Sequence, residues 1–219
     1  MDDLLTLASG SAHANSPLNI LIGLTILGLA PFLLVLMTSF VRIIVVFSLV
    51  RQAMGTQSLP PNTVLTGLAL ILTFLIMTPT LEKMSAVAVT PYAHGKITQR
   101  QLVDRGLEPL RDFMMRQTRQ KDIRVFMRVG HLKPGKREAV PLVALIPAFV
   151  VGELRAAFTI GFALYLPFLA IDLAVASILM SLGMMMLSPP IISLPCKLLL
   201  FVMVDGWSLV CAGLATSFR

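Results

Sequence analysis

The sequence predicts an all-α integral membrane protein. Of its 219 residues, 56% are hydrophobic and only 13% are charged, about half of the roughly 25% found in soluble domains. The apolar residues form runs that reach or exceed the roughly 20 residues a helix needs to cross a bilayer. Residues 82–138 hold thirteen Lys/Arg and six Asp/Glu, and therefore the whole net charge of +7. We expect two apolar helical regions, residues 17–81 and 139–219, on either side of this polar basic insertion.

The chain begins with a short polar segment, residues 1–16, which we expect to be poorly ordered. The apolar run that follows is too long for one span, and a central proline predicts a helix near residues 18–30, a bend, and a second helix to about Arg51. Glycine and proline predict a loop over residues 52–62. Residues 63–81 carry no charge and are long enough to span a membrane.

The polar insertion, residues 82–138, predicts two short amphipathic helices. Thr98 and Gln101 fit a capping box, so we expect a helix to begin there. Gly106 and Pro109 predict a break or kink in it. A second amphipathic piece covers residues 119–129. The insertion is too small for a large core of its own, so its apolar face is expected to pack on neighbouring subunits. It matches no nucleic-acid motif, and we predict no nucleic-acid binding.

The second apolar region follows a predicted loop at residues 130–141. We expect Pro147 and Pro167 to interrupt its helices. A glycine and a double proline then enclose Met184, Met185 and Met186, which predicts a turn made of thioether side chains. Such side chains adapt to irregular surfaces, so the turn is a candidate for a compliant seal. The spacing alone favours the alternative, in which the methionines fill a core.

Six charged residues lie within the apolar spans of these regions, three of each sign. Each costs about 2.5–3.5 kcal/mol at a bilayer centre, so the balance of signs predicts pairing within the protein or between subunits. They form either a polar pathway for protons or structural ion pairs, and we favour ion pairs because no histidine accompanies them. These buried charges are Arg42, Glu153, Arg155, Asp172, Lys197 and Asp205.

No catalytic chemistry is predicted from the residues. The three histidines lie far apart in polar segments, and no metal-ligand spacing occurs in the sequence. Phosphate-binding glycine loops, dinucleotide-binding motifs and nucleophile elbows are also missing from it. We therefore expect a protein that is not an enzyme, with no catalytic residue, no metal and no cofactor.

An ordered series of short motifs covers most of the chain and closely resembles the FliP family of flagellar type III secretion export-gate proteins. The injectisome equivalent, SctR, is similar. The series includes Met37-Thr38-Ser39-Phe40, Pro60-Pro61-Asn62, Pro147-Ala148-Phe149, Glu153-Leu154, Ile160-Gly161-Phe162, Leu166-Pro167-Phe168, Ile171-Asp172, the methionine turn, Ile192-Ser193-Leu194-Pro195, Lys197 and Asp205-Gly206-Trp207.

The resemblance implies a helical-hairpin subunit of a cone-like export-gate assembly in the bacterial inner membrane, at the flagellar basal body. It implies a pentameric homo-oligomer, FliQ-like and FliR-like membrane partners, other export-apparatus proteins, and unfolded exported proteins in transit. It also implies that Met184, Met185 and Met186 form the pore gasket, in place of the core filling that spacing favours. The injectisome export-gate equivalent and an ion-coupled secondary transporter remain alternatives.

The side of the membrane on which the insertion lies is predicted in two ways. The positive-inside rule would place residues 82–138 in the cytoplasm, because they hold most of the basic residues. The resemblance implies the periplasmic side. We follow the resemblance, because the insertion mixes both signs and an assembled helical cone need not lie in the bilayer as ordinary spans.

Overall fold

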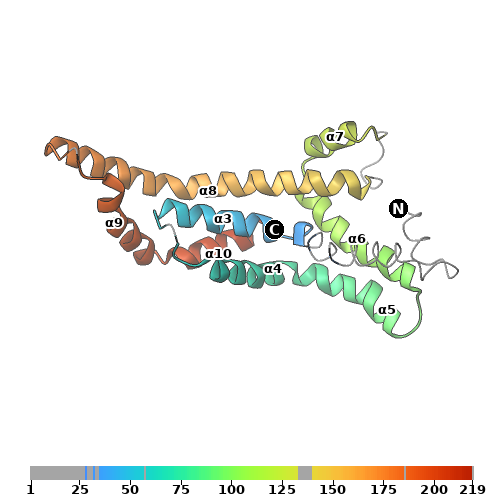
Figure 1. Ribbon diagram of the computed structural model, residues 1–219. Helices are drawn as coiled ribbons and strands as arrows, with labels where there is room; N and C mark the ends of the chain where they lie inside the picture. The colour runs from blue at the N-terminus through green and yellow to red at the C-terminus, as the bar shows by residue number, and fades with distance from the viewer. Residues whose placement is uncertain are drawn as a thin grey trace.

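The protein is elongated and its regular structure is helical (Figure 1). The computed structural model describes residues 28, 32, 35–56, 58–132, 140–184 and 186–218, and no strand occurs among them. The predicted all-α membrane class is therefore confirmed. The predicted polar segment at 1–16, the helix near 18–30 and the bend after it lie outside the described residues, apart from residue 28.

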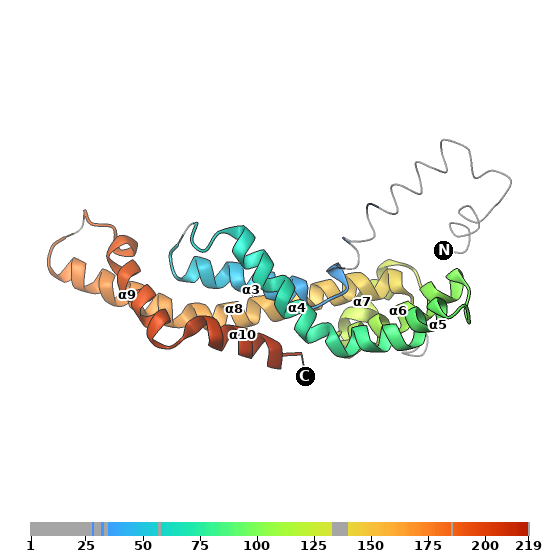
Figure 2. The same cartoon turned by 90° about the horizontal axis from the view of Figure 1, so that it is seen from below.

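The helices follow one another through short connections, and the longest, α8, runs along the length of the molecule (Figures 1 and 2). In chain order they are α3 (Phe40–Ala53), α4 (Asn62–Met84), the π-helical turn η1 (Ser85–Val89), α5 (Thr90–Ala93), α6 (Gln99–Gln117), α7 (Gln120–Val129), α8 (Leu142–Ser181), α9 (Pro189–Met203) and α10 (Gly206–Thr216).

Two helical stretches among the described residues are long and apolar enough to cross a membrane. They are Asn62–Ala93 and Leu142–Ser181. The first continues beyond the predicted end at residue 81, through η1 and into α5. Its backbone widens into a π turn just before Pro91, whose ring offers no N–H to the carbonyl of Val87.

Prolines do not interrupt α8, so the predicted breaks at Pro147 and Pro167 are wrong. The helix runs unbroken for 40 residues. Each proline removes a single backbone hydrogen bond, and an apolar helix tolerates that loss because ending in lipid would leave several groups unpaired. The predicted final segment divides instead at Asp205, where α9 and α10 bend by 62°.

The polar insertion gathers at one end of the molecule, opposite the α8–α9 connection (Figure 1). The predicted capping box is present: the Gln101 amide donates to the Thr98 hydroxyl, and the Thr98 amide donates to the Gln101 side chain. The predicted break at Gly106 or Pro109 does not occur, because α6 continues to Gln117. Pro109 is buried on the face that α6 packs against its neighbours, so packing holds the helix together there.

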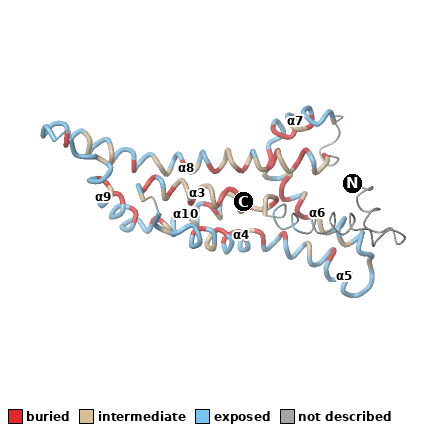
Figure 3. The backbone as a smooth tube through the Cα atoms, in the orientation of Figure 1, coloured by how far each residue is buried: buried red, intermediate tan, exposed pale blue. Residues whose placement is uncertain are grey.

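Two hydrophobic clusters hold the helices together. The first joins α3, α4, α8, α9 and α10, and Trp207 packs edge-on against Phe47 and Phe201 within it. The second joins the start of α8 to α6 and α7, with Phe113 edge-on against Phe149 at 5.8 Å between ring centroids. Both clusters use α8, but neither covers its last turns before the methionine turn, which leaves that end of the helix as a projection (Figure 3).

Candidate functional site

The methionine turn closes the hairpin between α8 and α9, as predicted. Gly183 has a φ of +73°, a left-handed conformation that ends helices at little cost for glycine. The Gly183 amide donates to the Met180 carbonyl and the Met184 amide to the Leu179 carbonyl, at 3.1 and 2.9 Å. This pair of bonds is the Schellman motif. The double proline that starts at Pro189 then begins α9, where its missing N–H costs nothing.

The side chains at this turn are exposed rather than packed. Met184 is 42% exposed and Met186 fully exposed, and Leu182 and Ile191 beside them are also exposed. Met185 lies outside the described residues. The turn forms the far tip of the molecule (Figures 1 and 3). Met184 and Met186 therefore fill no core of the single chain, which is the opposite of what the spacing alone favoured.

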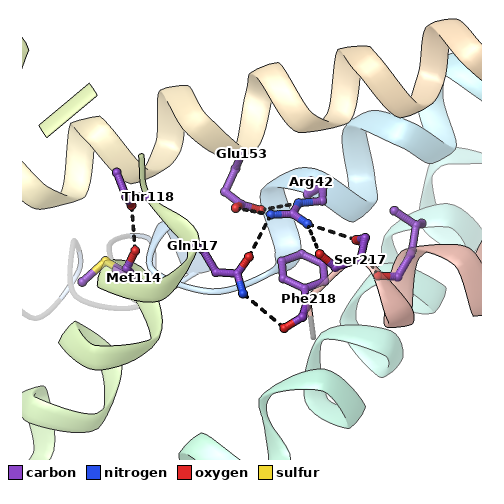
Figure 4. A network of polar contacts seen from close by, with 8 residues as sticks. Arg42, Met114, Gln117, Thr118, Glu153, Ser217 and Phe218 are labelled. Carbon is purple, nitrogen blue, oxygen red and sulfur yellow. Dashed lines mark hydrogen bonds and ion pairs between the residues drawn. The ribbon is translucent and has the colours of Figure 1, made fainter. Parts of the chain in front are cut away.

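The most buried of the charged groups in the apolar helices is the pair Arg42 and Glu153, on α3 and α8 (Figure 4). Two bonds join them: Nε of Arg42 donates to Oε2 at 2.8 Å and Nη2 to Oε1 at 2.6 Å. Such a paired fork fixes the angle between the two side chains as well as their distance. The pair thus sets the register of α3 on α8.

The same guanidinium also holds the C-terminal end of the chain. Its Nη1 donates to the carbonyl and hydroxyl oxygens of Ser217, both at 3.0 Å. The Phe218 ring lies 3.7 Å from its central carbon, and Gln117 of α6 bonds both Arg42 and the Phe218 carbonyl (Figure 4). Sequence reasoning missed these three partners, because neutral polar and aromatic residues near helix ends carry no distinguishing signal.

Arg155 connects the other face of α8 to the polar insertion. Its two terminal nitrogens donate to the carboxylate of Asp122 on α7 at 2.7 and 3.0 Å. Asp122 is buried, whereas the Arg155 side chain is 38% exposed. Because the guanidinium donates to it, the pKa of Asp122 lies below its ordinary value. Asp122 was not among the predicted residues, although an acidic residue in the first turn of an amphipathic helix is a weak signal.

The third pair joins α8 to α9 near the hairpin tip. Nζ of Lys197 donates to Oδ2 of Asp172 at 2.6 Å, and the Ser193 hydroxyl donates to Oδ1 at 2.5 Å. Lys197 is buried and Asp172 is partly exposed. Asp205, expected among the buried charges, is instead exposed, and its carboxylate meets no cation among the described residues.

Three ion pairs link α8 to α3, α7 and α9. Arg42, Arg155 and Lys197 each donate to a carboxylate on another helix. In the part of the chain that the structure describes, no group of three His, Cys, Asp or Glu side chains is placed to hold a metal ion. These contacts suit the fixing of helix register, which is the best attested use of buried ion pairs.

Comparison with known proteins relates nearly the whole chain to one family. Residues 23–214 match the family model described as the FliP family. The chain is 47% identical to the flagellar biosynthetic protein FliP of Bacillus subtilis (strain 168) over the full length of both. It is 51% identical to the protein of that name from Pectobacterium carotovorum subsp. carotovorum, over 90% of this chain and 77% of that one. The Aquifex aeolicus protein of the same name is 43% identical, over 98% of this chain and 91% of its own.

Proposed function

Because the chain belongs to the FliP family, we propose that it is a core subunit of the flagellar type III protein export gate and forms the protein-conducting pore. Its substrates are unfolded flagellar proteins that cross the bacterial inner membrane at the flagellar basal body. Membership of the family places the protein in the flagellar export apparatus, and its apolar helices fit a membrane location. The pore, its cargo and the particular membrane are the proposed parts.

The observation that carries the proposal is the exposed methionine turn at the tip of a hairpin of membrane-span length. Several copies arranged about one axis would bring Met184, Met185 and Met186 together as an apolar ring. A narrow apolar constriction closes to ions by dewetting. It must also yield to an unfolded chain of varied side chains, and methionine suits this because it is unbranched and has three rotatable side-chain bonds.

The partners follow from the same proposal. The subunit forms a homo-oligomer, pentameric in the family, together with FliQ-like and FliR-like membrane proteins and other components of the export apparatus. The gate catalyses no reaction of its own. The exposed apolar side chains along α4, α8 and α9 are available for contact with lipid or with neighbouring subunits. We expect a discrete oligomer, and a well-folded monomer in mild detergent at all concentrations would contradict it.

The orientation proposed for the subunit places α5, α6 and α7 on the periplasmic side. These helices gather at the end of the molecule opposite the methionine turn (Figure 1). The basic insertion is not a simple loop, because α6 and the start of α8 share one hydrophobic cluster. The side of the membrane on which a folded domain lies depends less on its basic residues than is the case for a short loop.

The direct test replaces Met184, Met185 and Met186 with alanine in the assembled complex. We expect normal assembly and a closed complex that conducts ions, measured in planar bilayers. The matched control is Met180→Ala, which removes a methionine that is 61% exposed but lies on α8, before the turn. If the triple variant assembles and its conductance equals that of the parent complex, the gasket is refuted.

An ion-coupled secondary transporter has less support from the geometry. It would need carboxylates free to bind a coupling ion near the bilayer centre. Glu153 and Asp172 are instead paired with cations of the same chain. Among the described residues this leaves Asp205 as the one acid of the apolar regions without a cation. Saturable uptake of a small solute by reconstituted vesicles would be the result that favours the transporter.

A further inference from the structure

The charges of the apolar regions do not all cancel within one chain. Residues 35–81 and 140–218 contain Arg42, Arg51, Glu153, Arg155, Asp172, Lys197 and Asp205 as their charged side chains. Three of the cations are bonded to carboxylates on other helices. Among the described residues, this leaves one cation and one acid in these regions without a partner of opposite charge: Arg51 and Asp205.

Asp205 occupies an unusual position for an unpaired acid. It lies at the bend between α9 and α10, with a left-handed backbone at φ 50° and ψ 52°. Aspartate is one of the few residues other than glycine that tolerate this conformation. Around it are exposed apolar side chains, including Val202 at 74% and Met203 at 75% exposed. A surface of this kind in a membrane complex needs a covering, and the covering must supply a cation for the carboxylate.

Arg51 carries the opposite charge to Asp205 and also lies beside exposed apolar surface. It lies in the last turn of α3, where one terminal nitrogen donates to the side-chain oxygen of Asn62 at 2.5 Å and to the Pro60 carbonyl at 3.4 Å. These neutral acceptors hold the guanidinium in place without cancelling its charge. Exposed Leu59 lies in the same α3–α4 connection, at 65% exposure. The connection thus presents a fixed cation beside apolar surface.

The two positions lie at a similar level along the molecule but on different sides of it. In Figure 2 the α3–α4 connection and the α9–α10 bend lie on opposite sides of α8, and Figure 1 places both near the same point along the long axis. In a head-to-tail ring each copy contacts one neighbour through one surface and the other neighbour through a different surface. The two surfaces must therefore lie at the same height along the subunit, as these two positions do.

We propose that Arg51 of one copy pairs with Asp205 of the next copy of this chain, at a head-to-tail interface inside the gate. The proposal rests on the proposed function, because it assumes that copies of the chain surround one axis. The partner is a second copy of this chain, because one surface carries a single unpaired positive charge and the other a single unpaired negative charge. Assembly then neutralises both charges in the apolar region.

The first experiment tests the charges in the complex expressed with its membrane partners. We expect Asp205→Asn, which keeps a residue that tolerates the left-handed backbone, and Arg51→Gln each to lower recovery of the oligomer about tenfold, or about 1.4 kcal/mol. Arg51→Asp combined with Asp205→Arg should restore recovery above that of either reversal alone. The control Glu82→Gln changes an exposed acid outside these regions and should have no effect. Unchanged recovery in both single variants would overturn the pairing.

The second experiment does not depend on yield. Cys196 and Cys211 are replaced by serine, and Arg51→Cys is combined with Asp205→Cys. Oxidation should link chains into a ladder that continues beyond the dimer, because a head-to-tail contact repeats around the ring. Either cysteine alone should give no ladder. A dimer only, no cross-link, or a cross-link from Asp205→Cys to another membrane protein would each overturn the proposal.

These outcomes separate the pairing from the proposed function. A parent complex that assembles and supports export while the cross-link fails refutes the Arg51–Asp205 pair and leaves the gate intact. A parent chain that forms no oligomer with its partners refutes the gate itself.

Discussion

The two halves of α8 share one helix and one apolar composition, yet they meet different surroundings. In the first half, residues 142–161, seven residues are buried, and Glu153 among them is paired with Arg42. In the second half only Phe168 and Leu179 are buried (Figure 3). The first half packs inside the chain, and the second half is left for lipid or neighbouring subunits. The hydrophobicity of the sequence therefore predicted the position of α8. It did not predict which part of α8 packs inside the chain and which part is left for lipid or neighbouring subunits.

The largest expected effect comes from breaking the buried pair in the first half. Glu153→Gln leaves the Arg42 guanidinium buried without its counter-charge, which costs about 3–5 kcal/mol. We expect the purified subunit to unfold at lower denaturant and to assemble poorly. The control Glu82→Gln changes an exposed acid on α4 and should leave stability within about 0.5 kcal/mol. Equal stability of the two variants would contradict the assignment of this half as the packed one.

A glycine pair on α8 tests the packing without touching any charge. A Cβ at Gly161 would lie 2.3 Å from the Cδ1 atom of Leu49 and 3.0 Å from its Cβ, whereas a Cβ at Gly152 meets nothing within 4 Å. Gly161→Ala should therefore destabilise the protein by about 1–3 kcal/mol. Gly152→Ala should be neutral or stabilising, because alanine favours helix. Denaturant midpoints of the two variants measure the difference, and matching midpoints would show that α3 and α8 are loosely packed.

A smaller effect is expected from the ion pair of the second half. Asp172→Ala leaves the buried Lys197 without its carboxylate, but the Ser193 hydroxyl, which shares that carboxylate, remains beside it as an acceptor, so we expect a cost of about 1–2 kcal/mol. Yield of the complex should fall before export is altered. Normal assembly with export that no longer responds to the proton gradient would instead support a proton relay at this pair.

The smallest effect concerns α7, which Asp122 fastens to the first half of α8 through Arg155. Asp122→Asn should cost about 1 kcal/mol at pH 7, because Arg155 is partly exposed. The folded state lowers the pKa of Asp122, so the pair stabilises the protein above the unfolded value of about 3.9. This contribution is lost as pH falls below that value, through the lower pKa of the folded state.

Thermal unfolding at several pH values measures this last contribution. The parent and Asp122→Asn should differ at pH 7 and pH 5 and converge below about pH 4. Asp104→Asn, which changes an exposed acid on α6, is the matched control. A difference that persists unchanged into acid would assign the effect to packing rather than to the carboxylate.

The sequence by itself determined the features that depend on neighbouring residues. The low charge content and long apolar runs set the membrane class, and Thr98 with Gln101 set the start of α6. Glycine and paired prolines around Met184 set the hairpin turn. Each of these signals acts within a few residues of the chain, where the covalent backbone already brings the groups together.

Only the tertiary structure decided which charges meet and which prolines matter. Arg42 finds Glu153 across 111 residues of sequence and Ser217 across 175, distances over which no local pattern selects a partner. Pro147 and Pro167 remain inside α8 because ending an apolar helix would leave more backbone groups unpaired than one proline removes. Asp205 is exposed at the bend between α9 and α10, and beside it the ring of Phe201 occupies the space that a Cβ at Gly206 would fill, a contact that the local sequence does not predict.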